Sequence, residues 1–130
     1  MIVHTGEALI DFLPVRDSNG RTAFLPVPGG SPYNTSVAAA RLEVPNAFLG
    51  RISRDFFGDQ LVSYLEENGV GTDMITRDDA LSTLAFVKKL DSGAVRYAFS
   101  PRGRRTGISY RPISPAFPPV RRRSSSGRSP

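Results

Sequence analysis

The stretch PGGSPYNTSVAAARL, residues 28–42, joins a proline and a glycine pair to a polar turn and an alanine-rich segment. Alanine favours helix, and we predict a helix over residues 35–42. A glycine pair before a helix either turns a corner or lets the backbone approach a ligand closely. Asn34 is equally ambiguous, because asparagine suits both a helix N-cap and a polyol, and taken singly the cap is favoured. The stretch alone leaves a turn and a binding site both open.

The residues before this stretch predict strands. Residues 1–15, MIVHTGEALIDFLPV, are β-branched and apolar at their start and are typical of one buried strand. In the segment VRDSNGRTAFLPV, Asn19-Gly20 predicts a type I′ hairpin between two short strands.

The residues after it alternate strand and helix patterns. NAFLGRIS, residues 46–53, predicts a core strand, and DFFGDQLVSYLEENG, residues 55–69, predicts an amphipathic helix with Gly69 at its C′ position. The apolar face of that helix consists of Phe57, Leu61, Val62 and Leu65. Residues 70–76 predict a short strand, and residues 82–100 predict two strands around an Asp91-Ser92-Gly93 turn. This order predicts an α/β fold with a parallel sheet and an added antiparallel flap made by the two hairpins.

Composition narrows the class of protein. The chain has 130 residues, no cysteine and a single histidine, His4, so disulfides are excluded and we expect no metal site. No apolar run approaches the roughly 20 residues of a membrane helix. The start of the chain carries Glu7 and lacks the basic residues of a signal peptide, so we expect a cytoplasmic protein without membrane contacts.

The positive charge of the chain is confined to its last residues. Residues 1–100 contain nine Lys and Arg against twelve Asp and Glu, whereas residues 101–130 contain eight arginines and no acid. The later segment also has six prolines and no strand or helix period, so we expect residues 100–130 to be disordered. This segment is either an arginine-rich arm that binds nucleic acid or a stretch without selected function, and the acidic balance of residues 1–100 argues against the first.

Asp11 follows apolar residues at the expected end of the first strand. Ligands of open α/β sheets bind beyond the carboxyl ends of strands, so a carboxylate there can hold substrate hydroxyls. An aspartate that merely ends a strand is an equally good interpretation. The glycine pattern matches neither a phosphate-binding loop nor a dinucleotide fingerprint.

The combination of motifs is more specific than any one of them. Asp11, the glycine stretch, VPNAFLGRISRDFFGDQL, ENGVGTDMI and STLAFVKKLDSGAVRYAF follow in an order that resembles the ribokinase-like (PfkB) carbohydrate kinases, most closely the bacterial fructokinases. The resemblance covers residues 1–99 and implies the N-terminal part of a Rossmann-like fold with a small antiparallel β lid. It implies transfer of the ATP γ-phosphoryl group to a sugar, with Mg²⁺. It also implies that the sugar is bound by Asp11, Gly29, Gly30 and Asn34, with Tyr97 and Phe99 as candidate lid contacts.

Two positions depart from the family pattern. Ser53 stands where the family has glycine, and Glu43 stands where it prefers glycine or serine. Because a left-handed C′ residue after a helix favours glycine, Glu43 is the more unusual of the two.

The family's G-A-G-D motif, which supplies the catalytic base and an anion hole, does not occur in this sequence. We therefore expect a truncated kinase, with domain residues 1–99 and tail residues 100–130, that has no catalytic residue and is inactive alone. Residues 105–114 can be encoded by codons whose neighbouring frame reads DRHLLPADL, close to the family's continuation. We hypothesise a frame shift near residues 99–103, which the gene sequence tests. Because half of such a sheet leaves an exposed edge, we expect aggregation, a lid-mediated homodimer or partial folding of the isolated chain. A non-catalytic sugar-binding or nucleic-acid-binding module is the alternative function.

Overall fold

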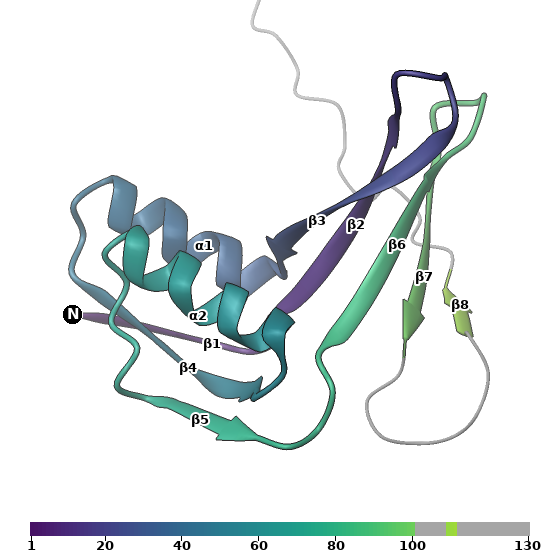
Figure 1. Cartoon of the computed structure of the whole chain (residues 1–130). Coiled ribbons are helices and arrows are strands. Elements are labelled where there is room, and N and C mark those ends of the chain that lie inside the picture. Colours follow the sequence, from purple (N-terminus) through teal and green to yellow (C-terminus); the bar gives the residue numbers. More distant parts are fainter. Residues whose placement is uncertain (101–108, 112–130) are drawn as a thin grey trace, which may run out of the picture.

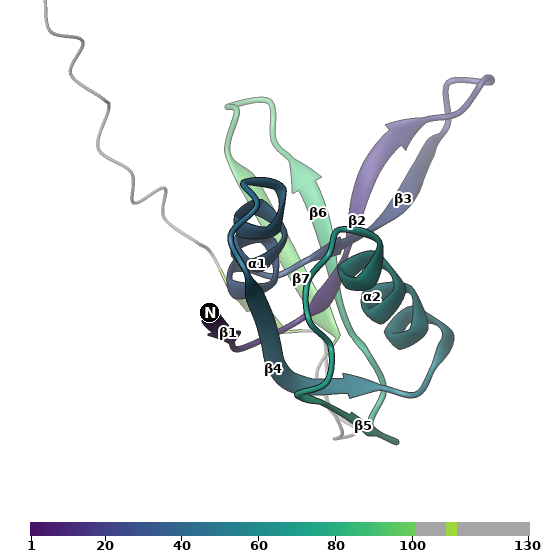
Figure 2. The same cartoon turned by 90° about the vertical axis from the view of Figure 1, so that its left-hand side faces the viewer.

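A computed structural model describes residues 1–100 and 109–111 of this chain (Figure 1). Its first sheet is parallel and has the strand order β1 (Ile2–Thr5), β4 (Asn46–Ser53), β5 (Ile75–Asp78). Helices α1 (Ser31–Arg41) and α2 (Phe56–Glu67) lie on the same side of this sheet (Figures 1 and 2). The predicted α/β class, with parallel strands and helical crossovers, is confirmed.

The second sheet forms the lid. Its strand order is β3 (Thr22–Gly29), β2 (Leu9–Arg16), β6 (Thr83–Lys89), β7 (Val95–Ser100), β8 (Ser109–Arg111). β2 and β3 form one antiparallel hairpin, β6 and β7 form the other, and β2 joins them by pairing with β6 in parallel. Both predicted hairpins are confirmed. β8 pairs with β7 in a segment for which the sequence pattern predicted no strand, and the rest of the predicted tail lies outside the described residues.

Two predicted strands have different bounds in the structure. Residues 1–15 form two strands in different sheets, because the chain turns at Gly6 (φ 144°) and leaves the first sheet for the lid. A side chain at Gly6 would meet the Pro32 ring at 2.6 Å, so this turn is packed against the start of α1. The strand predicted over residues 70–76 begins only at Ile75, and Gly71 makes an isolated bridge to Ala47.

The first hairpin turn is not of type I′. Such a turn needs positive φ at both central residues, but Gly20 (φ 74°) has positive φ and Asn19 does not. The Gly20 N–H donates to the Asp17 carbonyl, and the Asp17 N–H donates to the Arg21 carbonyl, as in a type I turn followed by a glycine bulge. The Asp17 carboxylate explains the difference, because it accepts hydrogen bonds from the Asn19 and Arg21 amides at 2.9 and 2.8 Å.

The core lies between the helices and the first sheet. Its fully buried large side chains are Tyr33, Phe48, Ile10, Ile52, Leu61 and Leu65. Tyr33 of α1 donates its hydroxyl to the Leu61 carbonyl of α2 at 2.6 Å, which satisfies the one polar atom of this buried ring. The predicted apolar face of α2 is confirmed, since Phe57 and Val62 also pack against the core. Neither helix in the described part of the chain has the length and apolar character needed to cross a bilayer.

The carboxylate of Asp55 ties the second lid hairpin to α2. It caps the helix by accepting from the Gly58 amide at 2.8 Å, and it accepts from the Ser82 amide and hydroxyl at 2.8 and 2.7 Å. Burial alone would raise the pKa of Asp55, but these hydrogen bonds outweigh burial and lower it. Since Ser82 directly precedes β6, the carboxylate fixes the base of that hairpin.

Both helices end in the same Schellman motif. After α1, the Glu43 and Val44 amides donate to the Ala40 and Ala39 carbonyls. After α2, Gly69 and Val70 make the equivalent bonds to Glu66 and Leu65. The left-handed residue is Gly69 (φ 80°) in one motif, as predicted, and Glu43 (φ 59°) in the other. Among the described residues Glu43 is the only non-glycine with positive φ, so the unusual position in the sequence is also the strained position in the backbone.

We predict that Glu43→Gly raises the free energy of unfolding by about 1 kcal/mol, because glycine adopts this conformation without a Cβ penalty. Urea denaturation of the full chain measures the change. Gly69→Ala is the matched control and should destabilise, since it places a Cβ at the equivalent position. An unchanged or lowered midpoint for Glu43→Gly contradicts the prediction.

Candidate functional site

A cavity of about 630 Å³ lies where the lid meets the N-terminus of α1. It is lined by Glu7, Leu9, Asp11, Gly30, Ser31, Asn34, Thr35, Ala38, Tyr97 and Phe99. Its volume is within the range of about 300–1,000 Å³ that small-molecule sites occupy. Of the predicted sugar-binding residues and lid contacts, only Gly29 is absent from the lining, and it directly precedes Gly30.

Asp11 brings an unpaired carboxylate to this cavity. Asp11 is the third residue of β2 rather than the last residue of a strand. It reaches the cavity because the chain leaves the first sheet after β1 and enters the lid as β2. Its side chain is half-buried and makes no hydrogen bond with any residue that the structure describes. Burial raises the pKa of Asp11, and the nearby charge of Glu7 raises it further. A carboxylate held in this way, without a partner, is typical of a group that binds a ligand.

The glycine pair makes room for the protein's own atoms. A Cβ at Gly29 would lie 2.1 Å from the Oδ2 atom of Asp11, so any side chain there would displace the carboxylate. A Cβ at Gly30 would lie 2.6 Å from the Glu7 carbonyl, and Gly30 also has φ 110°. The pair therefore lets β3 and the start of α1 pack directly against the segment that carries Asp11.

Asn34 lies inside α1 and is not its N-cap. The helix begins at Ser31 rather than at Thr35 because Gly30 supplies the N-cap, and the Asn34 amide already donates to the Gly30 carbonyl at 2.8 Å. The interpretation of Asn34 as a cap is therefore wrong. Its exposed side chain makes no hydrogen bond within the described residues and lines the cavity, so both its donors and its acceptor are available to a ligand.

Two aromatic residues of β7 form the opposite wall. Tyr97 and Phe99 lie on the same face of the strand, with ring centroids 6.0 Å apart and planes inclined by 17°. Both side chains are half-buried and line the cavity, so part of each ring stays exposed to the cavity and is not buried in the core.

Five further residues line the cavity without having been predicted from the sequence, namely Glu7, Leu9, Ser31, Thr35 and Ala38. Glu7 was placed within one continuous strand, and only the turn at Gly6 directs it toward Asp11. Thr35 lies one helical turn after Ser31, and its hydroxyl donates to the Ser31 carbonyl at 2.9 Å. Ser31, Thr35 and Ala38 are three or four residues apart and so share one face of α1. A helix predicted to begin at Ser31 would have placed all three beside Asn34 at the cavity.

The sequence profile of the pfkB family carbohydrate kinases matches residues 1–100. The chain belongs to this PfkB family. A fructokinase of Rhizobium leguminosarum bv. trifolii is 40% identical over 103 residues, which cover 79% of this chain and 31% of that protein. Probable fructokinase-5 of Arabidopsis thaliana is 39% identical over 105 residues, covering 76% of this chain and 32% of that protein. The chain thus spans about a third of the length of these curated relatives.

Solved structures agree with this family. The fructokinase of Xylella fastidiosa with bound ATP has a TM-score of 0.69 and 42% identity, covering 77% of this chain and 30% of that one. The fructokinase of Vibrio cholerae in its fructose, ADP and calcium ion bound form has a TM-score of 0.61 and 31% identity, covering 68% of this chain and 28% of that one. The N-terminal part of a PfkB carbohydrate kinase fold, including the lid, is therefore present in this chain.

We predict that Asp11→Asn raises the stability of the chain at neutral pH. The pKa of Asp11 is higher in the folded state than its ordinary value of 3.8. The protonated carboxyl therefore favours folding below pH 3.8, and this favourable contribution to the free energy of unfolding is lost as the pH rises through the pKa of the folded state. The gain from Asp11→Asn, measured by urea denaturation, should therefore be larger at pH 7 than at pH 4. Asp91→Asn, at an exposed turn, is the control. A gain independent of pH argues against the burial of an unpaired charge.

Proposed function

We propose that residues 1–99 form the sugar-binding part of a fructokinase-like sugar kinase. The observation that carries this proposal is the cavity in which the unpaired Asp11 carboxylate and the free Asn34 amide face two stacked aromatic rings. The names of the relatives support fructose as the first sugar to test.

The chemistry of these groups suits a polyol. An ionised carboxylate accepts hydrogen bonds from neighbouring hydroxyls, and a side-chain amide both donates and accepts. The rings of Tyr97 and Phe99 present flat apolar surfaces to the C–H groups of a sugar. These groups come from β2 and β7 of the lid and from α1, which packs on the first sheet. A bound sugar would therefore hold the lid against the α/β layer, which consists of the first sheet with α1 and α2, and help to exclude water.

In this proposal, the whole kinase transfers the γ-phosphoryl group of ATP, and this chain supplies binding without transfer. Phosphoryl transfer needs a base for the acceptor hydroxyl and electrostatic stabilisation of the transferred group. The G-A-G-D motif that would supply the base is absent from the sequence. Among the described residues, no three carboxylate or imidazole groups gather where they could hold a metal ion, so we assign no step to Mg²⁺ here.

We further propose that residues 100–130 lie outside the kinase domain and that the protein acts in the cytoplasm, where ATP is available. A nucleic-acid-binding function would rest on the arginines of that segment. The family match ends at residue 100, and the matched part carries twelve Asp and Glu against nine Lys and Arg. We therefore do not favour it.

Thermal unfolding with and without fructose tests the proposed function. Fructose should raise the midpoint of the full chain because it binds the folded state. Asp11→Ala and Asn34→Ala should abolish that rise, and Asn19→Ala, in the exposed turn of the first hairpin, should preserve it. ATP consumption with fructose should stay at background. A midpoint unaffected by fructose in the unaltered chain refutes the sugar-binding role.

We also propose that the lid face that carries Asp11, Tyr97 and Phe99, which we call the sugar-side face, mediates a homodimer. Leu13 and Leu25 are cross-strand neighbours on this face and are 37% and 52% exposed. Apolar side chains exposed side by side are typical of an interface. Light scattering should report a dimer for the unaltered chain and a monomer for Leu13→Ser/Leu25→Ser, with unchanged circular dichroism. A monomeric unaltered chain contradicts this proposal.

A further inference from the structure

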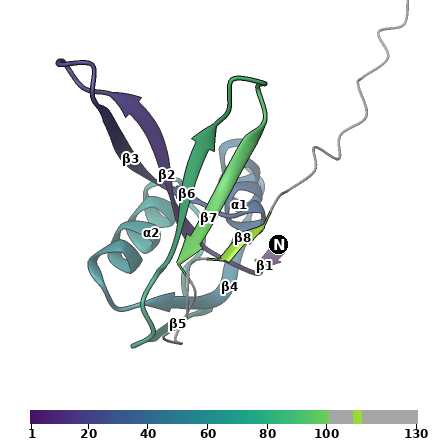
Figure 3. The same ribbon diagram turned by 90° about the vertical axis from the view of Figure 1, so that its right-hand side faces the viewer.

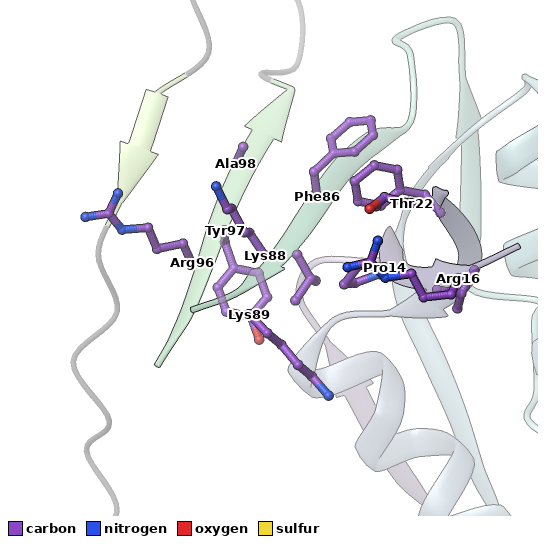
Figure 4. A pocket seen from close by; sticks show the side chains of 12 residues that line it. Pro14, Arg16, Thr22, Phe86, Lys88, Lys89, Arg96, Tyr97 and Ala98 are labelled. Atoms are coloured by element: carbon purple, nitrogen blue, oxygen red, sulfur yellow. The ribbon is translucent and has the colours of Figure 1, made fainter. Parts of the chain in front are cut away.

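A second cavity, the hairpin cleft, opens between the two arms of the lid. β2 and β6 are paired only from Leu9 to Phe12 and from Thr83 to Phe86, and beyond these residues the hairpins diverge (Figure 3). The cleft has a volume of about 780 Å³. It is lined by Pro14, Val15, Arg16, Thr22, Phe24, Phe86, Val87, Lys88, Lys89, Arg96, Tyr97 and Ala98 (Figure 4). Pro14 has no N–H to donate, which favours the end of the β2–β6 ladder just before it.

The vertex of the cleft, where the arms meet, is aromatic. Phe86 stacks on Phe12 with ring centroids 4.6 Å apart, and it meets Phe24 edge-to-face at 5.6 Å. Phe24 is 45% exposed and Phe86 is 37% exposed, so this cluster presents ring surface to the cleft. An apolar or planar group therefore fits at the closed end.

The arms beyond the vertex are cationic. Because side chains alternate along a strand and Phe12 pairs with Phe86, Arg16 and Lys88 lie on the same face of the lid as these rings. Arg96 is directly opposite Lys88 and shares that face. Figure 4 shows Arg16 on one arm and Lys88 and Arg96 on the other. The opposed pair Lys88–Arg96 is unfavourable, since like charges directly across two strands repel.

Nothing in the described chain neutralises this charge. None of the ion pairs among residues 1–100 and 109–111 includes Lys88, Lys89 or Arg96. No carboxylate belongs to the described lining of the cleft. Residues 101–130 have eight arginines and no Asp or Glu, so their side chains cannot supply one. A repulsive pair without a carboxylate suggests that the missing partner is an anion outside the chain.

We propose that the hairpin cleft binds a nucleoside polyphosphate, with its base at the aromatic vertex and its phosphates between Arg16, Lys88 and Arg96. Arginine and lysine bind phosphate oxygens through charge-assisted hydrogen bonds, and aromatic rings stack on bases. Among the described residues, only Tyr97 lines both this cleft and the cavity that carries Asp11 and Asn34, which we call the sugar-side cavity. The site is thus distinct from the proposed sugar site and does not depend on it.

Calorimetric titration of the full chain with ATP tests the site. Lys88→Gln/Arg96→Gln should weaken ATP binding on the order of tenfold or more, because each charged contact contributes substantially. Arg121→Gln/Arg122→Gln removes the same charge from the arginine-rich segment and is the matched control, which should leave affinity within about twofold. Equal weakening by both variants would show that ATP binds the arginines of that segment, and it overturns the proposal.

A second measurement separates binding from a structural role. Without ATP, Lys88→Gln/Arg96→Gln should raise the urea midpoint, because it removes a repulsive pair, although it weakens ATP binding. If instead the variant self-associates and its ATP affinity is unchanged, the cations only protect open strand edges, and the proposal fails.

Ligand and site variants complete the test. Tripolyphosphate should bind more weakly than ATP, and Phe24→Ser should remove that difference in affinity. Equal binding of the two ligands to the unaltered chain rules out a base at the vertex.

Asn34→Ala should abolish the fructose effect on thermal unfolding and leave ATP binding unchanged. Loss of ATP binding in Asn34→Ala would show that the nucleotide occupies the sugar-side cavity, and it overturns the cleft site.

Discussion

The close contact between Gly29-Gly30 and the Glu7–Asp11 segment is the constraint on which the described structure depends. At this contact the chain leaves the first sheet for the lid, returns from the lid and starts α1. The absence of a side chain at Gly29 lets the Asp11 carboxylate occupy its position, and Gly30 provides both the close approach to the Glu7 carbonyl and the N-cap of α1. The sugar-side cavity, the helix start and the base of the first hairpin are therefore placed by one backbone contact.

The second hairpin is held by a different and more polar contact. Asp55 accepts hydrogen bonds from both the amide and the hydroxyl of Ser82, and the same carboxylate caps α2. Each arm of the lid is thus tied to the α/β layer at its own base, and the arms pair with each other only next to those bases. This arrangement explains why the arms can diverge toward their tips and leave an open cleft between them (Figure 3).

The sequence predicted those features that local chemistry determines. The two hairpins, the apolar face of α2 and the left-handed residue after each helix follow from turn residues, period and capping. Residues 1–15 were predicted as one strand because their apolar pattern is continuous, and only the packing of Gly6 against Pro32 breaks it. The start of α1 was missed because a glycine N-cap resembles an ordinary turn, and this error also left Asn34 as a candidate cap. Of the predicted site, Asp11, Gly30, Asn34, Tyr97 and Phe99 meet in one cavity, whereas Glu7 needed the tertiary structure to be recognised.

The two faces of the lid have different chemistry because side chains alternate along its strands. On β6 and β7, Ala85, Phe99 and Tyr97 share the face of Asp11, and Phe86, Lys88 and Arg96 share the opposite face. The strands β6 and β7 thus carry cations of the cleft on one face and the aromatic wall of the sugar-side cavity on the other. Any shift of these strands on binding at one face would change the free energy of binding at the other, and by thermodynamic linkage that effect would be reciprocal.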